Sequence, residues 1–445
     1  MIRKQKQTTQ GSFFNGLADL VDQKHPLYRL SHCINWQNFD EAFEPLYSEK
    51  MGAPAKPIRL MVSLLILKYL RNLSDESVVE QWSENIYFQY LGGEQFFRPS
   101  LPCVPTELVA FRYRIGSVGM ELILKESIRI NKPEGEENIG KTVSMDTTVQ
   151  EKSITYPTDD KLYKKIIIKC VGIARKEGIV LKQTYAKELK KLSIDQRFKK
   201  RKNGAKIARK ASKRVKTIAG RIHRNLVLQL SVGGICSYEH QLIIYEKVLA
   251  QNRGDKNKIY SLHEPNVTCY AKGKEHKKFE FGSKVSVTVC QHSGIILGAL
   301  NFAENIHDSR TVEQALEQVE RLHGKAPEEV FADRGYVGKT QHDDTKIYTP
   351  KTNPNITKQQ RKKHSKRAGI EPVIGHLKTD YRLCRNFLKG IFGDQVNIIL
   401  SAAAMNFKRR IVLWRTEAKL SWQFVLLLIV NVRREFYAQK LKLTF

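Results

Sequence analysis

Long apolar segments are missing from this sequence of 445 residues. The longest apolar runs, at 61–67 and 424–430, are closely flanked by charge and are too short to cross a bilayer. The opening residues, MIRKQKQTTQGSFF, are basic but lack the apolar stretch that a secretory signal needs. We therefore expect a soluble cytoplasmic protein with no membrane partner.

Paired cysteines are also absent. The seven cysteines are scattered, odd in number and include no CxxC pair. This pattern fits a reducing compartment and gives no support to a structural zinc site. Some other residues could be suggested as metal ligands, but they lack zinc-like spacing and we interpret them as loop or helix-cap residues: His263, His276, His307 and Asp308.

Acidic residues are scarce relative to basic ones. The chain has 76 Lys and Arg against 45 Asp and Glu, a net charge of +31, while its 41% hydrophobic content argues against a disordered polycation. Such an excess of positive charge favours polyanions as partners, with nucleic acid first. A basic structural protein is the alternative that charge alone leaves open.

The N-terminal third, residues 25–130, has mainly helical spacing of its apolar residues. The segment 57–93 predicts two helices, the second starting at Ser74. Two such helices fit a helix-turn-helix, or equally part of any helical bundle. Arg112 and Arg114 in FRYRIG are candidates for contact with DNA phosphate, although a solvated helix face explains them as well.

Strand patterns begin after a boundary rich in Pro, Gly and acid at 132–140. β-Branched residues predict a strand at 141–149, and two further strands are predicted about a turn at 292–294. The remaining predicted elements are a helix at 309–324 and short strands at 328–333 and 345–350. Together they predict a mixed sheet with helices against it, an α+β fold.

A long insertion, at about 150–280, separates the first strand from the next two. Its centre, 182–224, carries 17 Lys and Arg against two acids, and the apolar residues among them predict helix. We expect this part to lie along a DNA backbone, with a solvated helical face as the competing interpretation. The cations proposed for DNA binding are Lys199, Lys200, Arg201 and Lys202.

Two aspartates stand at comparable places on predicted strands. Asp146 lies in SMDTT, and Asp333 follows the strand in FADRGYVG. Neighbouring strands lie about 4.8 Å apart, and paired metal ions in phosphoryl-transfer sites lie about 3.5 to 4 Å apart. The two aspartates could therefore bridge a pair of ions if their strands are adjacent, although a single strand-end aspartate is more often a turn or cap residue.

A third acid comes from the helical candidate at 365–386. Glu371 and Lys378 are seven residues, or two helical turns, apart and therefore point the same way. Pro372 disfavours helical geometry at the residue before it, so the helix either kinks or begins there. Arg367 lines up with the other two only if the helix extends backwards, and Glu371 alone would more often be a solvated residue.

These motifs resemble those of the DDE transposases of bacterial insertion sequences. ADRGY and the stretch at 144–163 are similar to motifs of that family. Arg367, Glu371 and Lys378 match the end of the subgroup signature Tyr-x2-Arg-x3-Glu-x6-Lys, whereas His364 stands where that signature has Tyr. The resemblance covers most of the chain, including 91–102, 260–287 and 385–407.

The resemblance implies a ribonuclease-H-like sheet whose first and fourth strands are neighbours. It implies that Asp146, Asp333 and Glu371 bind two Mg²⁺ ions, for which Mn²⁺ can substitute, and that Arg367 and Lys378 hold phosphate. The implied reaction is cleavage at the ends of an insertion sequence and strand transfer into target DNA. The implied partners are double-stranded DNA, as terminal inverted repeats and as target, and a second copy of the chain, with the DNA-bound protein associated with the nucleoid.

We accordingly expect a helical DNA-binding or assembly domain at 1–132, a catalytic domain at 138–410 and a helical tail at 411–445. Two alternatives stay open. A ribonuclease-H-like nuclease that cuts without joining would use the same acids. A catalytically silent, transposase-derived DNA-binding protein would keep the fold, although the intact triad argues against it.

Overall fold

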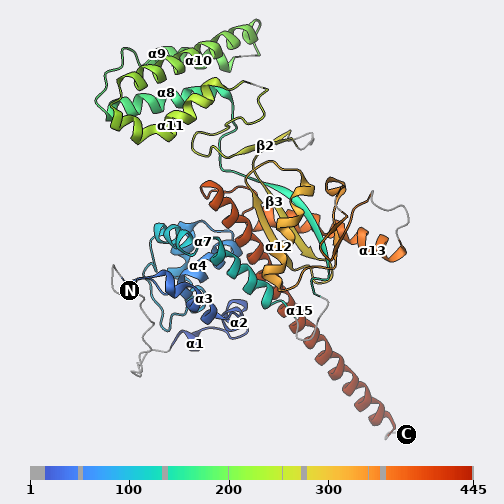
Figure 1. The fold of residues 1–445 in the computed structure, drawn as a ribbon. Coiled ribbons are helices and arrows are strands. Elements are labelled where there is room, and N and C mark those ends of the chain that lie inside the picture. The colour runs from blue at the N-terminus through green and yellow to red at the C-terminus, as the bar shows by residue number, and fades with distance from the viewer. Residues whose placement is uncertain are drawn as a thin grey trace.

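The computed structural model describes residues 16–48, 54–132, 139–198, 200–252, 254–271, 278–338, 340–350 and 357–442, with side chains through residue 417. Within this part of the chain lie a group of N-terminal helices, a seven-stranded sheet with helices against it, and a bundle of four helices set apart from both (Figure 1). The combination of helices with a mixed sheet confirms the predicted α+β class.

The N-terminal helices bear out the pattern read from the sequence. They are α1 (Leu17–Leu20), α2 (Pro26–Cys33), α3 (Trp36–Phe43), α4 (Ile58–Leu70), α5 (Asp75–Glu84), α6 (Ile86–Leu91) and α7 (Pro105–Arg129). The two helices predicted within 57–93 are α4 and α5, and the Ser74 hydroxyl caps α5 by accepting the Ser77 N–H at 3.0 Å. The third helix of that segment, α6, starts separately because the Asn85 side chain accepts the first free N–H groups.

Arg112 lies inside these helices and not on a DNA-facing surface. Its guanidinium donates two hydrogen bonds of 2.8 Å to Asp75, which also accepts one of 2.8 Å from Lys68. Burial opposes the ionisation of Asp75, but the bonds from Arg112 and the charge of Lys68 outweigh it and lower the pKa of Asp75 to about 2. Since Arg112 is only 4% exposed, the prediction that it contacts phosphate is wrong, and it instead ties α4, α5 and α7 together.

The sheet has the strand order β2-β3-β1-β5-β7-β6, with β4 also paired to β3. Its strands are β1 (Thr142–Glu151), β2 (Thr268–Ala271), β3 (Phe279–Cys290), β4 (Ile296–Phe302), β5 (Glu329–Phe331), β6 (Gln341–His342) and β7 (Thr345–Tyr348). All five strands predicted from the sequence are present. The central strand β1 is antiparallel to β3 and parallel to β5, so the strands that carry or precede the two aspartates are neighbours, as expected.

The helices of this part are α12 (Val312–His323), α13 (Lys358–Lys366), α14 (Ile370–Asp380) and α15 (Gly390–Lys442). α12 and α15 pack against β4, α14 contacts β1, and α7 packs along α15. The N-terminal helices and the sheet therefore share one hydrophobic core. The expected boundary at 410/411 lies inside α15, and no helix in the described residues is long and apolar enough to span a membrane.

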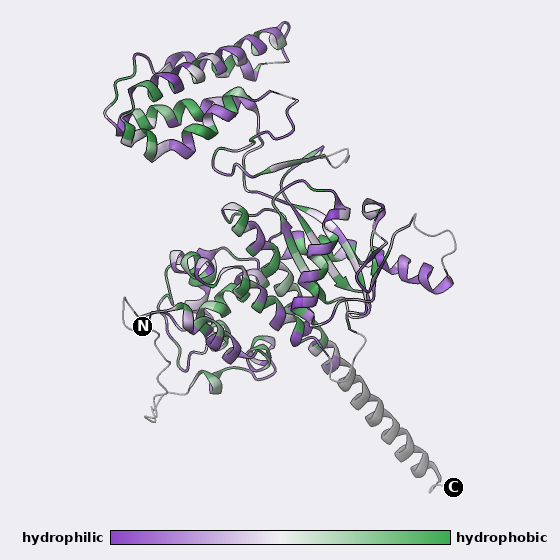
Figure 2. Cartoon of the chain, in the orientation of Figure 1, coloured by the Kyte–Doolittle hydropathy of each residue, from purple (hydrophilic) through white to green (hydrophobic). Residues whose placement is uncertain are grey.

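The insertion forms a separate bundle of α8 (Asp159–Lys176), α9 (Ala186–Arg197), α10 (Gly204–Gln229) and α11 (Val232–Ala250). Apolar side chains of α8, α10 and α11 make a second core of their own, visible as the hydrophobic faces inside the bundle (Figure 2). Lys152, just after β1, bonds Asp394 at 2.7 Å and approaches Glu264 to 3.4 Å. Both segments that connect the bundle to the sheet are thus anchored at the start of α15.

Candidate active site

Asp146 lies in the middle of β1, beside Asp333, which follows the end of the short neighbouring strand β5. β1 and β5 pair in parallel with Ser144 opposite Phe331, and each aspartate is two residues further along its chain. Asp333 ends the strand by accepting the Gly335 N–H at 2.8 Å, which caps the short helix η3 (Arg334–Tyr336). Asp333 therefore both caps a helix and lies beside a second carboxylate, that of Asp146.

The electrostatics of Asp146 show that its carboxylate lacks a close cation. Burial and then the charge of Asp333 raise its pKa to about 6, while Arg367 acts weakly in the opposite direction. Its Oδ1 accepts only the N–H of Thr147, at 2.7 Å, and neither aspartate has an ion-pair partner among the described residues. The ionised state of Asp146 is thus disfavoured by burial and by a neighbouring carboxylate, as expected of a ligand for a metal ion.

A third carboxylate, Asp308, also faces this place. It lies on the short helix η2 (Asp308–Arg310), and its Oδ1 accepts the Thr147 hydroxyl at 2.8 Å and the Lys284 ammonium at 2.7 Å. Its Oδ2 lies against Gly335. A Cβ atom added to Gly335 would stand 2.7 Å from Asp308 Oδ2 and 3.0 Å from Asp333 Oδ1. The glycine in ADRGY therefore leaves room for two carboxylates.

Sequence reasoning missed Asp308 and treated it, with His307, as a loop or cap residue. For His307 this is confirmed, because its ring caps η2 by accepting the Ser309 N–H at 3.4 Å. The sequence holds no comparable signal for Asp308, which comes six residues after the end of β4, whereas Asp333 comes two residues after the end of β5. Only the tertiary contact of η2 with η3 brings Asp308 to Asp333.

Glu371 lies at the edge of the site. α14 begins at Ile370, directly after the short helix η4 (Arg367–Gly369), which itself directly follows α13, so the helical backbone extends back beyond Pro372 and changes to the tighter η4 turn just before it. The Glu371 side chain is 68% exposed, and its Oε1 is 4.0 Å from the Arg367 guanidinium. Among the described residues no three His, Cys, Asp or Glu side chains are arranged to hold a metal ion.

Arg367 connects Glu371 to the two aspartates. Its side chain is 18% exposed, and its charge lowers the pKa of Asp146. Lys378 lies two turns beyond Glu371 on α14 and is half-buried. His364, on α13, packs edge-on against the Phe331 ring of β5, with 6.1 Å between the ring centres. Burial lowers the pKa of His364.

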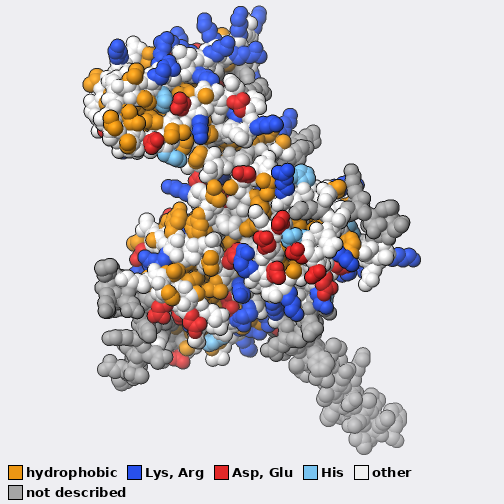
Figure 3. Space-filling view, in the orientation of Figure 1, with side chains coloured by type: hydrophobic (Ala, Val, Ile, Leu, Met, Phe, Trp, Pro, Cys, Tyr) orange, Lys and Arg blue, Asp and Glu red, His pale blue; other side chains and the backbone are white. Residues whose placement is uncertain are grey.

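The remaining DNA-binding candidates are exposed cations far from the aspartates. Arg114 is exposed and places its guanidinium 4.3 Å from the centre of the Tyr47 ring. Lys200, Arg201 and Lys202 are exposed in the turn between α9 and α10, and Lys and Arg side chains gather over these two helices (Figure 3). Lys199 and His276 lie outside the described residues.

The donor set fits a hard divalent cation. Asp146 and Asp333 offer only carboxylate oxygens, which Mg²⁺ prefers, and a bound cation would offset the burial and the charge that raise the pKa of Asp146. The fit is incomplete in this arrangement, because Glu371 points to solvent and Asp308 is already bonded to Lys284.

Comparison with known proteins gives matches at both ends of the chain. Residues 16–114 match the family described as a transposase domain (DUF772), and residues 253–407 match the family described as a transposase DDE domain. The second match contains Asp308, Asp333 and Glu371, and it starts just after α11. It therefore leaves out Asp146 and the helical insertion.

An uncharacterized protein, ORF8 in the nfe locus of Rhizobium meliloti, is 39% identical over 188 residues. That match covers 41% of this chain and 88% of the relative. No solved structure matches the chain.

Proposed function

Because the chain belongs to the DDE transposases of insertion sequences, metal-dependent enzymes that transfer phosphoryl groups of DNA, we propose that it cuts DNA at the ends of its own element and joins those ends to target DNA. The observation that best supports this reaction is the juxtaposition of Asp146, in the middle of β1, and Asp333, just after the end of the parallel strand β5. The raised pKa of Asp146, caused by burial and by the charge of Asp333, suits the pair for binding a cation.

We assign Asp146, Asp333 and Glu371 as the acids that hold Mg²⁺, with Mn²⁺ as a substitute. When bound there, the metal supplies a Lewis acid beside the phosphodiester and lowers the pKa of the attacking hydroxyl. Arg367 lies between the aspartates and Glu371, where its planar guanidinium can donate to two phosphate oxygens at once. Lys378 places a single positive charge further along the same helix.

Asp308 is assigned a positioning role in this site. It accepts a hydrogen bond from the hydroxyl of Thr147, the residue that follows Asp146, and it packs on Gly335, whose N–H donates to Asp333. It therefore restrains both aspartates from one side. Lys284 balances its charge, so that Asp308 does not add a full third negative charge beside the two aspartates.

The DNA would also contact cations away from the acids. The exposed residues 200–202 and Arg114 suit phosphate contacts, which position DNA without reading its bases. Two element ends have to be joined, so we propose that the chain acts on DNA as a homodimer. We place it in the cytoplasm, associated with the nucleoid while bound to DNA.

The test uses DNA from both borders of the coding region, with Mg²⁺, wild-type protein and Glu371→Gln. We expect the wild type to nick the borders and to join pre-cut border ends to a plasmid. Glu371→Gln should melt like the wild type, because the side chain is exposed, and should do neither. Glu320→Gln, an exposed position on α12, is the matched control and should retain both activities.

Each alternative gives a distinct result. Nicking without joining of pre-cut ends would identify a nuclease of the same fold. Binding of the borders without nicking would identify a silent DNA-binding protein. Full activity of Glu371→Gln would remove Glu371 from the site and leave the third acid to be found elsewhere.

A further inference from the structure

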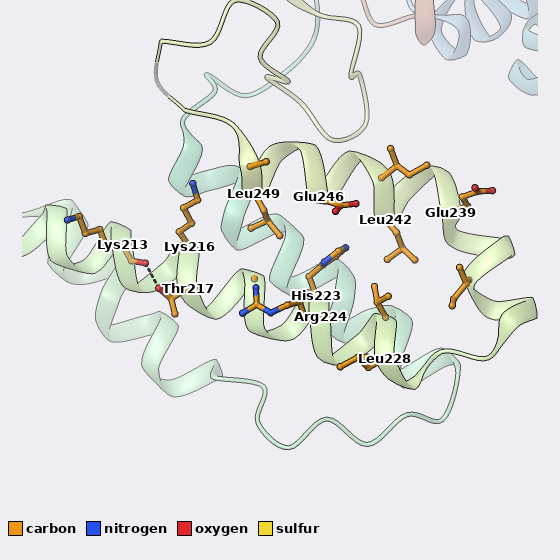
Figure 4. A pocket seen from close by; sticks show the side chains of 15 residues that line it. Lys213, Lys216, Thr217, His223, Arg224, Leu228, Glu239, Leu242, Glu246 and Leu249 are labelled. Atoms are coloured by element: carbon orange, nitrogen blue, oxygen red, sulfur yellow. Dashed lines mark hydrogen bonds between the residues drawn. The ribbon is translucent and has the colours of Figure 1, made fainter.

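A groove of about 1030 Å³ runs between α10 and α11 on the surface of the four-helix bundle (Figure 4). Its apolar lining consists of Val227, Leu228, Ile235, Leu242, Ile243 and Leu249. Leu228 is 84% exposed, and Val232, at the turn that closes the groove, is 81% exposed. A continuous apolar surface of this kind on a folded bundle indicates a surface that another macromolecule covers.

The two rims of this α10–α11 groove carry opposite charges. Lys216 and Arg224 stand on α10, and Glu239 and Glu246 stand on α11, with His223 between the two helices (Figure 4). Within the described part of the chain, Arg224, Glu239 and Glu246 form no ion pair. Unpaired charges of both signs along an apolar groove are typical of the polar rim of a protein interface.

The charges also match in height along the groove. α10 and α11 are antiparallel helices joined at 230–231, and Arg224 and Glu239 lie at similar distances from that turn. The same is true of Lys216 and Glu246. At about 1.5 Å of rise per residue, each pair therefore stands at nearly one level on opposite rims.

We propose that a second copy of this chain occupies the α10–α11 groove, with the two bundles face to face about a two-fold axis parallel to the helices. Such a rotation places α10 of one copy over α11 of the other and keeps every residue at its own height. Arg224 then meets Glu239 of the second copy, and Lys216 meets its Glu246. The exposed Leu228 and Val232 are buried near the turn.

The charges on the groove favour a second copy of the chain over DNA or an acidic peptide. DNA would place its phosphates against two carboxylates and an apolar surface, and an acidic peptide would meet the same carboxylates. The cations at 200–202 precede the N-terminus of α10, away from the turn at 230–231, so DNA and a second copy can be bound at the same time. The inference rests on the proposed function only for its purpose, the pairing of two ends, because the contact forms without DNA.

The experiment is sedimentation velocity of the full chain without DNA, at micromolar concentration. We expect a dimer for the wild type and roughly tenfold or greater weakening for Arg224→Glu or Glu239→Arg, since each change places like charges opposite each other. A one-to-one mixture of the two variants should regain the dimer, because every 224–239 contact in the mixed pair again joins opposite charges. Only pairing between copies can give this rescue.

Arg209→Glu, an exposed position on α10 that does not line the groove, is the matched control and should leave the dimer intact. Circular dichroism should show equal helix content for all variants. A monomeric wild type, a dimer insensitive to both charge reversals, or a mixture no stronger than its components would each overturn the inference. Border nicking is measured separately, so failure of this interface and failure of the proposed reaction are distinguishable.

Discussion

Asp146→Asn should stabilise the metal-free protein while it removes activity. Burial and the charge of Asp333 raise the pKa of Asp146 from 3.8 to about 6. Because the folded-state pKa lies above that of the unfolded chain, ionisation of Asp146 weakens the fold. This penalty is absent below pH 3.8, grows as the pH rises towards 6 and is complete above that value. A difference of about 2 pKa units corresponds to about 3 kcal/mol of unfolding free energy.

Asparagine has nearly the same shape and keeps an oxygen for the Thr147 N–H. At pH 8 without divalent metal, the variant should melt several degrees above the wild type, at roughly 2 to 4 °C per kcal/mol for a unit of this size. At pH 4.5 the gain should shrink to about 1 kcal/mol, because the wild-type carboxyl is then largely protonated. Calorimetry at both pH values measures this, with exposed Asp344→Asn as the control.

Mg²⁺ should affect the melting temperatures of the wild type and of Asp146→Asn differently. It should raise the melting temperature of the wild type and leave that of Asp146→Asn nearly unchanged, since the variant has lost one of the two adjacent carboxylates. Border nicking by the variant should be absent. If Asp146→Asn melts at or below the wild-type temperature at pH 8, ionised Asp146 does not destabilise the metal-free fold. The electrostatic argument for a metal site would then fail.

Three further changes test separate parts of the structure. Asp308→Asn should lower Mg²⁺ affinity and nicking roughly tenfold or more, as for residues that orient metal ligands; unchanged Mg²⁺ titration by calorimetry would remove its positioning role. Arg112→Ala should destabilise the N-terminal helices by about 3 to 5 kcal/mol in chemical unfolding, because it leaves a buried carboxylate without its main partner, and a loss below 1 kcal/mol would contradict this. Neutralising the cations at 200–202 should reduce the slope of log affinity against log salt by roughly two to three units on duplex DNA, at about 0.9 per phosphate contact; an unchanged slope would assign them to solvent.

Prediction from the sequence worked best where the signal is local. The β-branched run around Asp146 and the short apolar stretch before Asp333 were read as strands, and both are present. The helix start at Ser74 followed from its capping hydroxyl in the same way. Each of these depends on interactions within a few residues, which a sequence pattern records directly.

Charged side chains were harder to place because burial is not a local property. Arg112 is as basic as Arg114, yet one is buried against Asp75, 37 residues earlier in the chain, and the other is exposed. Asp308 looked like a cap residue because its contacts with Thr147 cross 161 positions. Neither outcome could be read from the neighbouring residues.

The sequence by itself determined five of the seven strands, several of the helices, the excess positive charge and the two aspartates on or just after predicted strands. The tertiary structure alone decided that those aspartates are adjacent, that Asp308 faces them, that Glu371 lies exposed at the rim, and that α10 and α11 leave an apolar groove open. The reason is one of range. Backbone preferences act over a few residues, whereas strand pairing, burial and the electrostatic cost of placing like charges together arise only when distant segments meet.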